Sequence, residues 1–336
     1  MFPFLILYIF QNELTYKSKE QGAGDMQNEV RAMLEGALIS GLFLVMIFLT
    51  IYTPLGIVTA LALPIPFTVY AARHRLRNAI LVIVASGLLT IIIGALPSIL
   101  LSLFAGVLGT VMGTAYHRQK SAFIAFVGGL LASLCLLILG VVVSYYMTKI
   151  NPITAMQTML KESMAMSKAM LENFNMVDPK QVDKMDEMIE FVPKLAPMLL
   201  IFASAQSAML NHWLSRKILR RLGSPAPAFP PFRDWRWPRS MLYIYLGVTI
   251  AAIFLSANQD QFSYVIVLNL KPILDTLMII QGLSLVSFYS HQKGWGRGLL
   301  IIAIVMLFIF SPIPFILVLL GVLDLSMNVR KPLSKK

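Results

Sequence analysis

Apolar runs of about 20 residues recur along the chain, and short basic clusters separate them. Wound as an α-helix, a run of this length crosses the roughly 30 Å hydrocarbon core of a membrane. The 336 residues are 57% hydrophobic and only 13% charged, whereas soluble domains carry about 25% charged residues. We therefore predict an all-α, polytopic transmembrane helix bundle with about eight full spans. The spans are expected near residues 34–52, 55–72, 79–96, 99–116, 122–147, 197–214, 241–257 and 264–289.

The last apolar stretch, residues 299–325, is interrupted by Ser311-Pro312-Ile313-Pro314. Each half holds about 12 residues, which is short of the roughly 20 that a full crossing requires. A single broken span would place the basic tail outside the cell, whereas a short hairpin would return it to the cytoplasm. Because basic residues are retained on the cytoplasmic side, we favour the hairpin.

The net charge of +12 arises from the basic clusters between the spans. With the N-terminus inside, these clusters fall on the cytoplasmic side, as the positive-inside rule requires. We expect a multi-pass protein of the plasma membrane with both termini in the cytoplasm. Membrane lipids are expected partners. Nucleic acid is not, because the spans leave no large soluble domain to present a basic binding surface.

A long polar excursion at residues 148–194 is the exception to this charge pattern, with six lysines and seven acidic residues. A long and balanced segment can be translocated. Residues 152–174 have apolar residues, many of them Met, at helical spacing, and a second helix is expected near Asp178-Pro179. We predict an extracytoplasmic helical hairpin on the membrane surface. The alternatives are a lid over a substrate opening and copper binding through thioethers, which the lack of nearby His and Cys disfavours.

The spans and loops suggest four regions of the chain. Residues 1–25 are expected to be a non-native or disordered extension, with Met26 as the natural start. Residues 26–222 should form a six-span N-terminal bundle that includes the excursion. A cytoplasmic loop rich in proline and aromatic residues follows at 223–239, and residues 240–336 should form a C-terminal membrane bundle with a basic tail.

The sequence lacks the motifs of common enzymes and cofactor sites. It contains no phosphate-binding glycine loop, no His-Glu-x-x-His and no Gly-x-Ser-x-Gly. Cys135 is the single cysteine, which rules out an intrachain disulfide and a cysteine metal cluster. We expect no enzymatic activity, no cofactor and no metal site. If ATP drives this protein, a partner must hydrolyse it.

Charged residues inside the eighth predicted span provide the candidate site. Lys271 and Asp275 are four residues apart and can pair on one helical face. Pro272 can free a backbone carbonyl between them, and Asn269 and Gln281 add polar groups to the same span. Such residues mark either a solute site or a structural pair. Three interpretations remain at this point: an internal pair that fixes helix packing, a substrate-binding site at Asn269, Lys271, Asp275 and Gln281, and charges that reach the outer interface.

Small residues recur at helical spacing in the early spans: Ala37 and Gly41 on one helix, and Gly106, Gly109 and Gly113 on another. This spacing permits close approach of helices, either within the bundle or to a docking partner. Asp324 lies near the end of the last apolar half and close to Arg330, which is typical of a helix-end charge, although a site role stays open.

Several stretches resemble the YybS-like family of bacterial predicted membrane proteins. They are Arg31-Ala-Met-Leu-Glu-Gly-Ala-Leu-Ile-Ser-Gly, Leu63-Pro-Ile-Pro-Phe with Arg73-His-Arg-Leu-Arg, Gln281-Gly-Leu-Ser-Leu and Leu320-Gly-Val-Leu-Asp324. The resemblance extends from about Met26 to the C-terminus and implies a membrane protein, without further chemistry.

The first half also resembles the substrate-binding S components of energy-coupling factor vitamin transporters. Those are six-span bundles whose small-residue faces dock a membrane coupling subunit with ATPases, so the resemblance implies such a partner. The long excursion and the extra C-terminal spans depart from that pattern. We expect a transporter or a transporter-associated subunit for an unidentified solute. The alternative is a non-catalytic scaffold or assembly protein of the bacterial cell envelope.

Overall fold

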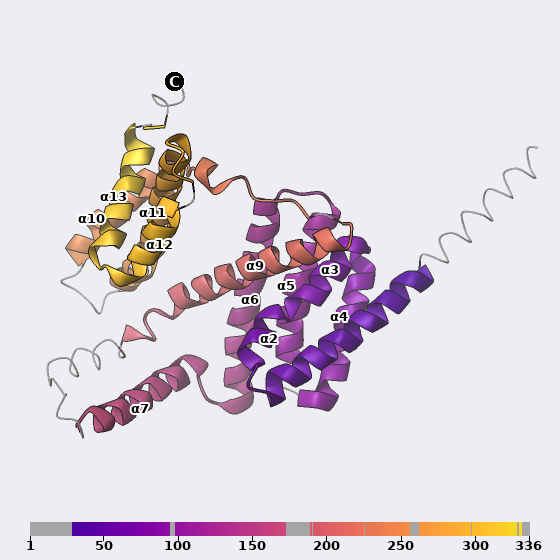
Figure 1. Cartoon of the computed structure of the whole chain (residues 1–336). Helices are drawn as coiled ribbons and strands as arrows, with labels where there is room; N and C mark the ends of the chain where they lie inside the picture. Colours follow the sequence, from indigo (N-terminus) through magenta and orange to yellow (C-terminus); the bar gives the residue numbers. More distant parts are fainter. Residues whose placement is uncertain are drawn as a thin grey trace, which may run out of the picture. The chain divides into compact units, whose positions relative to one another are not determined.

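The computed structural model describes residues 29–94, 98–172, 189, 191–224, 226–255, 262–296, 298–327 and 329–330 (Figure 1). In these ranges the chain forms α-helices and one short 3-10 helix, and no strand. The predicted all-α fold is thereby confirmed. Two expectations, the extension at residues 1–25 and the second excursion helix near Asp178-Pro179, lie outside the described residues.

Six helices in the described part of the chain are long and apolar enough to cross a membrane. The five of these helices that lie in the N-terminal half match the first five predicted spans. The sixth helix matches the predicted span at 264–289. The six are Glu29–Tyr52, Gly56–Arg73, Leu76–Gly94, Ser98–His117, Ala122–Thr148 and Phe262–Gln292. The other three apolar helices are shorter: Ser240–Leu255, Gly298–Ile309 and Pro312–Met327.

The helix at the predicted sixth span is α9 (Ala196–Arg221), which has 26 residues. It is long enough to cross a membrane but is not among the six apolar candidates. Polar residues such as Asn211 and His212 and a basic last turn lower its hydropathy. Asn211 and His212 form buried hydrogen bonds with other helices of the protein.

The chain divides into two compact units, which are described separately. Unit 1 comprises Met1–Gly140 and Ser204–Ala228, and unit 2 comprises Val141–Ala203 and Phe229–Lys336. The described residues of the excursion, 148–172, 189 and 191–194, fall in unit 2 together with the C-terminal helices.

Unit 1 is built around the contact between two helices, α3 (Pro64–Arg73) and α5 (Ser98–His117). Proline at the start of α3 suits the first helical turn, where no amide donor is needed. A Cβ on Gly109 would lie 2.4 Å from the Pro64 carbonyl oxygen, and one on Gly113 would lie 2.5 Å from that of Thr68. The absence of side chains at these glycines therefore allows close backbone contact. The remaining elements are the helix Glu29–Tyr52, α2 (Gly56–Ala62), α4 (Leu76–Gly94) and parts of α6 (Ala122–Thr148) and α9.

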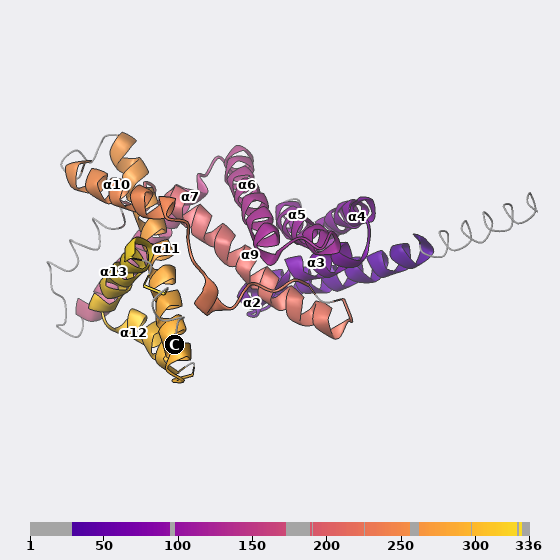
Figure 2. The ribbon, with the colours of Figure 1, turned by 90° about the horizontal axis from the view of Figure 1, so that it is seen from above.

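Within unit 1, α9 lies against α3 and α5, as two perpendicular views show (Figures 1 and 2). Its fully buried Asn211 donates a hydrogen bond from Nδ2 to Thr68 Oγ1 over 2.9 Å. The next residue, His212, bonds through Nδ1 to the Tyr116 hydroxyl over 2.7 Å. Pairing of this kind offsets the cost of placing polar groups in an apolar interior.

Unit 2 is centred on α11 (Phe262–Gln292), which contacts α10 (Ser240–Leu255), α12 (Gly298–Ile309) and α13 (Pro312–Met327). The last apolar stretch is therefore two separate helices that both pack on α11, and not one continuous span. A short 3-10 helix, η1 (Phe232–Asp234), also contacts α11. The excursion begins with α7 (Pro152–Glu172), close to the range in which the sequence predicts a helix. Buried residues of the unit 2 core are Leu242, Tyr245, Leu274, Met278, Val318 and Leu325.

Candidate functional site on helix α11

The ion pair that the sequence anticipated is formed on α11. The Lys271 ammonium bonds to the Asp275 carboxylate, four residues along the helix. The ammonium also lies 5.0 Å from the centre of the Tyr245 ring on α10. The side chains of Lys271 and Asp275 remain 25% and 33% exposed. The Lys271–Asp275 pair therefore contacts the Tyr245 ring on one side, and another side of the pair is exposed.

The pair lies well inside α11. At 1.5 Å per residue, Lys271 is about 14 Å from the start of this 31-residue helix. Between the two charges, Pro272 has no amide hydrogen, so the Leu268 carbonyl loses its usual helical donor. The Thr276 hydroxyl donates to the Pro272 carbonyl over 2.8 Å. The local backbone is therefore more polar than that of a regular apolar helix.

Asn269, a predicted member of the site, instead joins α11 to the start of α9 within unit 2. Its Oδ1 accepts a hydrogen bond from the Met198 amide over 2.9 Å, and its Nδ2 donates to the Lys194 carbonyl over 2.7 Å. The first amides of a helix have no partner inside the helix, so Asn269 acts as a cap from a neighbouring helix. Its amide is occupied by backbone groups.

Gln281, the fourth predicted residue, belongs to a second polar centre near the other end of α11. Its Nε2 donates to the carboxylate of Asp324 on α13, and its Oε1 accepts from the Trp237 amide over 3.0 Å. The four predicted residues therefore do not form one site. Lys271 and Asp275 form a pair, while Asn269 and Gln281 make separate contacts on either side of it along α11.

Asp324 is the centre of this second polar cluster, which we call the Asp324 clasp: Gln281, Ser284, Asp324 and Arg330. The Asp324 side chain is fully buried, and Arg330 Nη2 lies 2.6 Å from its Oδ2. Arg330 Nε also reaches Oδ1 over 3.1 Å. The expected proximity of Asp324 and Arg330 is present, but the carboxylate lies in the interior rather than at a solvated helix end.

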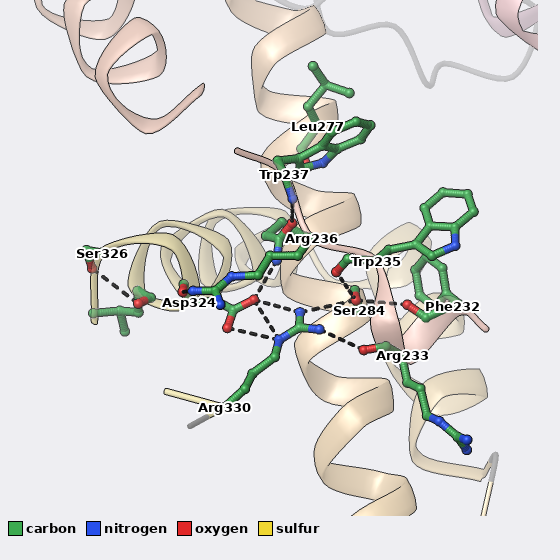
Figure 3. A network of polar contacts seen from close by, with 12 residues as sticks. Phe232, Arg233, Trp235, Arg236, Trp237, Leu277, Ser284, Asp324, Ser326 and Arg330 are labelled. Atoms are coloured by element: carbon green, nitrogen blue, oxygen red, sulfur yellow. Dashed lines mark hydrogen bonds and ion pairs between the residues drawn. The ribbon is translucent and has the colours of Figure 1, made fainter. Parts of the chain in front are cut away.

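The Asp324 clasp also holds the loop that precedes α10 (Figure 3). Arg330 Nη1 donates to the Arg233 carbonyl over 2.7 Å. The Ser284 hydroxyl lies 2.9 Å from the Phe232 carbonyl oxygen and 2.8 Å from that of Trp235. The Trp237 indole donates to the Leu277 carbonyl over 3.1 Å. One cluster therefore fixes α11, α13 and the loop together.

Sequence reasoning missed the Asp324 clasp as a unit. Gln281, Ser284 and Asp324 come from the stretches Gln281-Gly-Leu-Ser and Leu320-Gly-Val-Leu-Asp324, which are far apart along the chain, and Arg330 follows the second stretch. Each stretch combines a glycine with polar residues inside an apolar run, and this shared pattern is the signal that could have linked them.

The small residues singled out in the early spans divide into two groups. Gly109 and Gly113 pack against α3, and a Cβ on Gly106 would meet Ile83 of α4 at 2.9 Å. Ala37 is exposed, and a Cβ on Gly41 would meet nothing within 4 Å. The α5 glycines are therefore used inside unit 1, whereas Ala37 and Gly41 lie on an open helix face. In the part of the chain that the structure describes, no group of three or more His, Cys, Asp or Glu residues could hold a metal ion.

Comparison with known proteins places these features in a family. Residues 41–325 match the model of a family described as "Predicted membrane protein (DUF2232)". The chain belongs to this family. It is also 28% identical over 305 residues to the uncharacterized protein YybS of Bacillus subtilis (strain 168), which covers 90% of this chain and 98% of that protein. The resemblance to YybS-like membrane proteins is thus confirmed.

The DUF2232 region includes the ion pair on α11 and Asp324, whereas Arg330 lies beyond its last matched residue. No solved structure matches the chain. The resemblance of the first half to S components therefore stays a prediction.

Proposed function

We propose that this membrane protein is a transporter, or a transporter-associated substrate-binding subunit, for a small polar or ionic solute. The observation that carries the proposal is the partly exposed Lys271–Asp275 pair within the long apolar helix α11. A charge that faces hydrocarbon costs several kcal/mol. The open side of the pair is therefore best covered by water, by a polar solute or by another polypeptide.

The Lys271–Asp275 and Asp324–Arg330 ion pairs differ in a way that favours this role for Lys271 and Asp275. Arg330 and Gln281 occupy the buried carboxylate of Asp324, which has no exposed surface. Lys271 and Asp275 bond mainly to each other, so a solute can substitute for either partner. We expect the pair to open and to bind groups of opposite charge on the solute.

Several neighbouring features suit such a site. Pro272 leaves a backbone carbonyl of α11 available as an acceptor. The last apolar stretch is broken into α12 and α13, which both contact α11, and discontinuous helices line binding sites in many transporters. In the proposed topology both termini lie in the cytoplasm of a bacterial cell, and the protein resides in the plasma membrane. If ATP drives transport, a membrane coupling subunit with ATPases is the expected partner.

The first test is purification of the full chain from native membranes in mild detergent, followed by mass spectrometry of the retained small molecules and proteins. A solute retained by the wild type should be lost from the Lys271→Ala, Asp275→Ala double variant. The matched control is Lys161→Ala with Glu162→Ala, which removes the same charges from the exposed surface of α7. Undiminished solute retention by the α11 variant would overturn the proposal.

A non-catalytic scaffold of the cell envelope is the second candidate. It is favoured by the engagement of Asn269 and Gln281 in contacts between structural elements. Under this function Lys271 and Asp275 only fix helix packing, so exchanging them (Lys271→Asp with Asp275→Lys) should preserve activity in cells. A transport site would lose its solute when the two charges are exchanged, which separates the two candidates.

A further inference from the structure

The C-terminal part of α9 has two chemically opposite faces. One face is buried in unit 1 and comprises Ser204, Ala208, Asn211, His212, Ser215 and Leu219. The other is exposed and carries Trp213, Arg216, Lys217 and Arg220. At 100° per residue these four side chains share one side of the helix. We call them the α9 cationic face.

The sequence on either side of the α9 cationic face is free of acidic residues. From residue 195 to residue 233 the sequence contains no Asp or Glu. Within the described ranges, no carboxylate pairs with Arg216, Lys217 or Arg220. A cluster of cations without counter-charges attracts an anion that carries several charges or shares its charge among several oxygens. Arginine is well suited to binding phosphate oxygens.

An aromatic ring organises this cluster. The Lys217 ammonium lies 3.7 Å from the centre of the Trp213 ring, which is 54% exposed. Contact with the face of an indole holds an ammonium in place. Tryptophan is also one of the two side chains, with tyrosine, that are enriched at the boundary between lipid headgroups and hydrocarbon.

Polarity changes in one direction along this side of α9. Exposed Met209 precedes Trp213 by one turn, and Arg216 and Arg220 follow it. The order is therefore apolar, then aromatic, then cationic. A phospholipid has the same order from acyl chain to headgroup, whereas a free phosphate ion would make no use of Met209 or of the exposed indole.

We propose that the α9 cationic face is a binding site for the phosphate-bearing headgroup of an anionic phospholipid. Arg216 and Arg220 contact the phosphate oxygens, Lys217 adds a third positive charge, and Trp213 lies beside the glycerol and upper acyl region. This site lies in unit 1 and does not depend on the transport function proposed for α11.

The test is native mass spectrometry of the full chain in detergent, titrated with phosphatidylglycerol. Each cation near an anionic lipid contributes about a fivefold increase in affinity, so Arg216→Gln with Arg220→Gln should weaken lipid retention roughly 25-fold. The matched control is Arg75→Gln with Arg77→Gln, which removes two exposed cations at and just after the start of α4 in the same unit. We expect the control to retain lipid nearly as the wild type does. Because all four arginines are exposed, both variants should melt at the wild-type temperature in the absence of lipid.

Two further measurements, one with other ligands and one with a Trp213 variant, identify the ligand. Phosphatidylcholine, which is zwitterionic, should bind weakly to the wild type, and millimolar inorganic phosphate should not displace phosphatidylglycerol. Trp213→Leu should weaken lipid retention more than it weakens any binding of free phosphate, because only the lipid also contacts the indole. Equal losses in the α9 variant and its control would overturn the proposal, because the effect would then reflect total charge. Efficient displacement by inorganic phosphate would overturn it as well, because the site would then recognise the free anion.

Discussion

Gly282 of α11 and Gly321 of α13 lie where these two helices meet, and neither position has room for a side chain. A Cβ on Gly282 would lie 2.1 Å from the Leu317 carbonyl oxygen, and a Cβ on Gly321 would lie 2.3 Å from that of Met278. Backbone contact between the helices brings Gln281 within hydrogen-bonding distance of Asp324. The Asp324 clasp therefore depends on two residues that have no polar side chain.

Replacing Gly282 with Ala should destabilise unit 2. The added methyl group would meet backbone atoms, which cannot rotate away, so α11 and α13 would have to separate at a cost of about 1–3 kcal/mol or more. The melting temperature in detergent is the measurement. Gly247→Ala on α10 is the control, because a Cβ there meets nothing within 4 Å. A similar effect of both substitutions would show that the helix contact is not tightly packed.

Removing either member of the buried Asp324–Arg330 pair should be severe. Asp324→Ala leaves the Arg330 guanidinium without its carboxylate, and breaking a buried pair costs about 3–5 kcal/mol. The double variant Asp324→Ala with Arg330→Ala should lose less stability than the sum of the single losses, because neither charge is then unpaired. The free energies of unfolding of the wild type, both single variants and the double variant give the coupling energy between the two residues. Strictly additive losses would contradict the predicted coupling.

Thr68 and Asn211 in unit 1 form a buried, uncharged pair. As with Asp324 and Arg330, removing one partner should cost more stability than removing both. Thr68→Val removes the hydroxyl that exchanges hydrogen bonds with the Asn211 amide. It should cost about 1–3 kcal/mol, since a buried polar group loses a partner. Thr68→Val combined with Asn211→Leu should recover part of the loss, as the unfolding midpoint in detergent would show. Further loss in the double variant would mean that other contacts of Asn211, such as the hydrogen bond that it accepts from the buried Ser215 hydroxyl, outweigh its pairing with Thr68.

Asn269→Ala should loosen the first turn of α9 without affecting the rest of that helix. The substitution removes the acceptor of the Met198 amide and the donor to the Lys194 carbonyl. Loss of a helix cap costs about 0.5–2 kcal/mol. Hydrogen exchange of residues 194–200 should therefore accelerate several-fold, while residues 208–216 exchange as in the wild type. Unchanged exchange at Met198 would argue that Asn269 is free to serve another role.

The helices of this protein were predictable because long apolar runs are a strong signal. The run expected at 122–147 forms Ala122–Thr148, and the run expected at 264–289 forms Phe262–Gln292. The Lys271–Asp275 pair was also predictable, since its members are one helical turn apart. These features depend only on residues that are close in sequence.

Contacts between distant segments could not be read in the same way. Asn269 and Gln281 were grouped with the charge pair because they share its helix, but each bonds to a different distant segment. The burial of Asp324 likewise depends on where α13 meets α11, and no local pattern encodes that position. The polar stripe of α9 was also misjudged as part of a simple apolar span, because its partners Thr68 and Tyr116 come from earlier helices.

The Asp324 clasp also sets an order of assembly during synthesis. The ribosome makes the loop at Phe232–Trp237 first, then α11, then Asp324, and Arg330 only afterwards. Until Arg330 emerges, the Arg233 carbonyl lacks its guanidinium donor and the Asp324 carboxylate lacks its counter-charge. The contacts that join α11, α13 and the loop at Phe232–Trp237 can therefore be complete only after Arg330 has been synthesised. A chain that ended before Arg330 would leave the buried Asp324 carboxylate without its counter-charge, at a cost of about 3–5 kcal/mol.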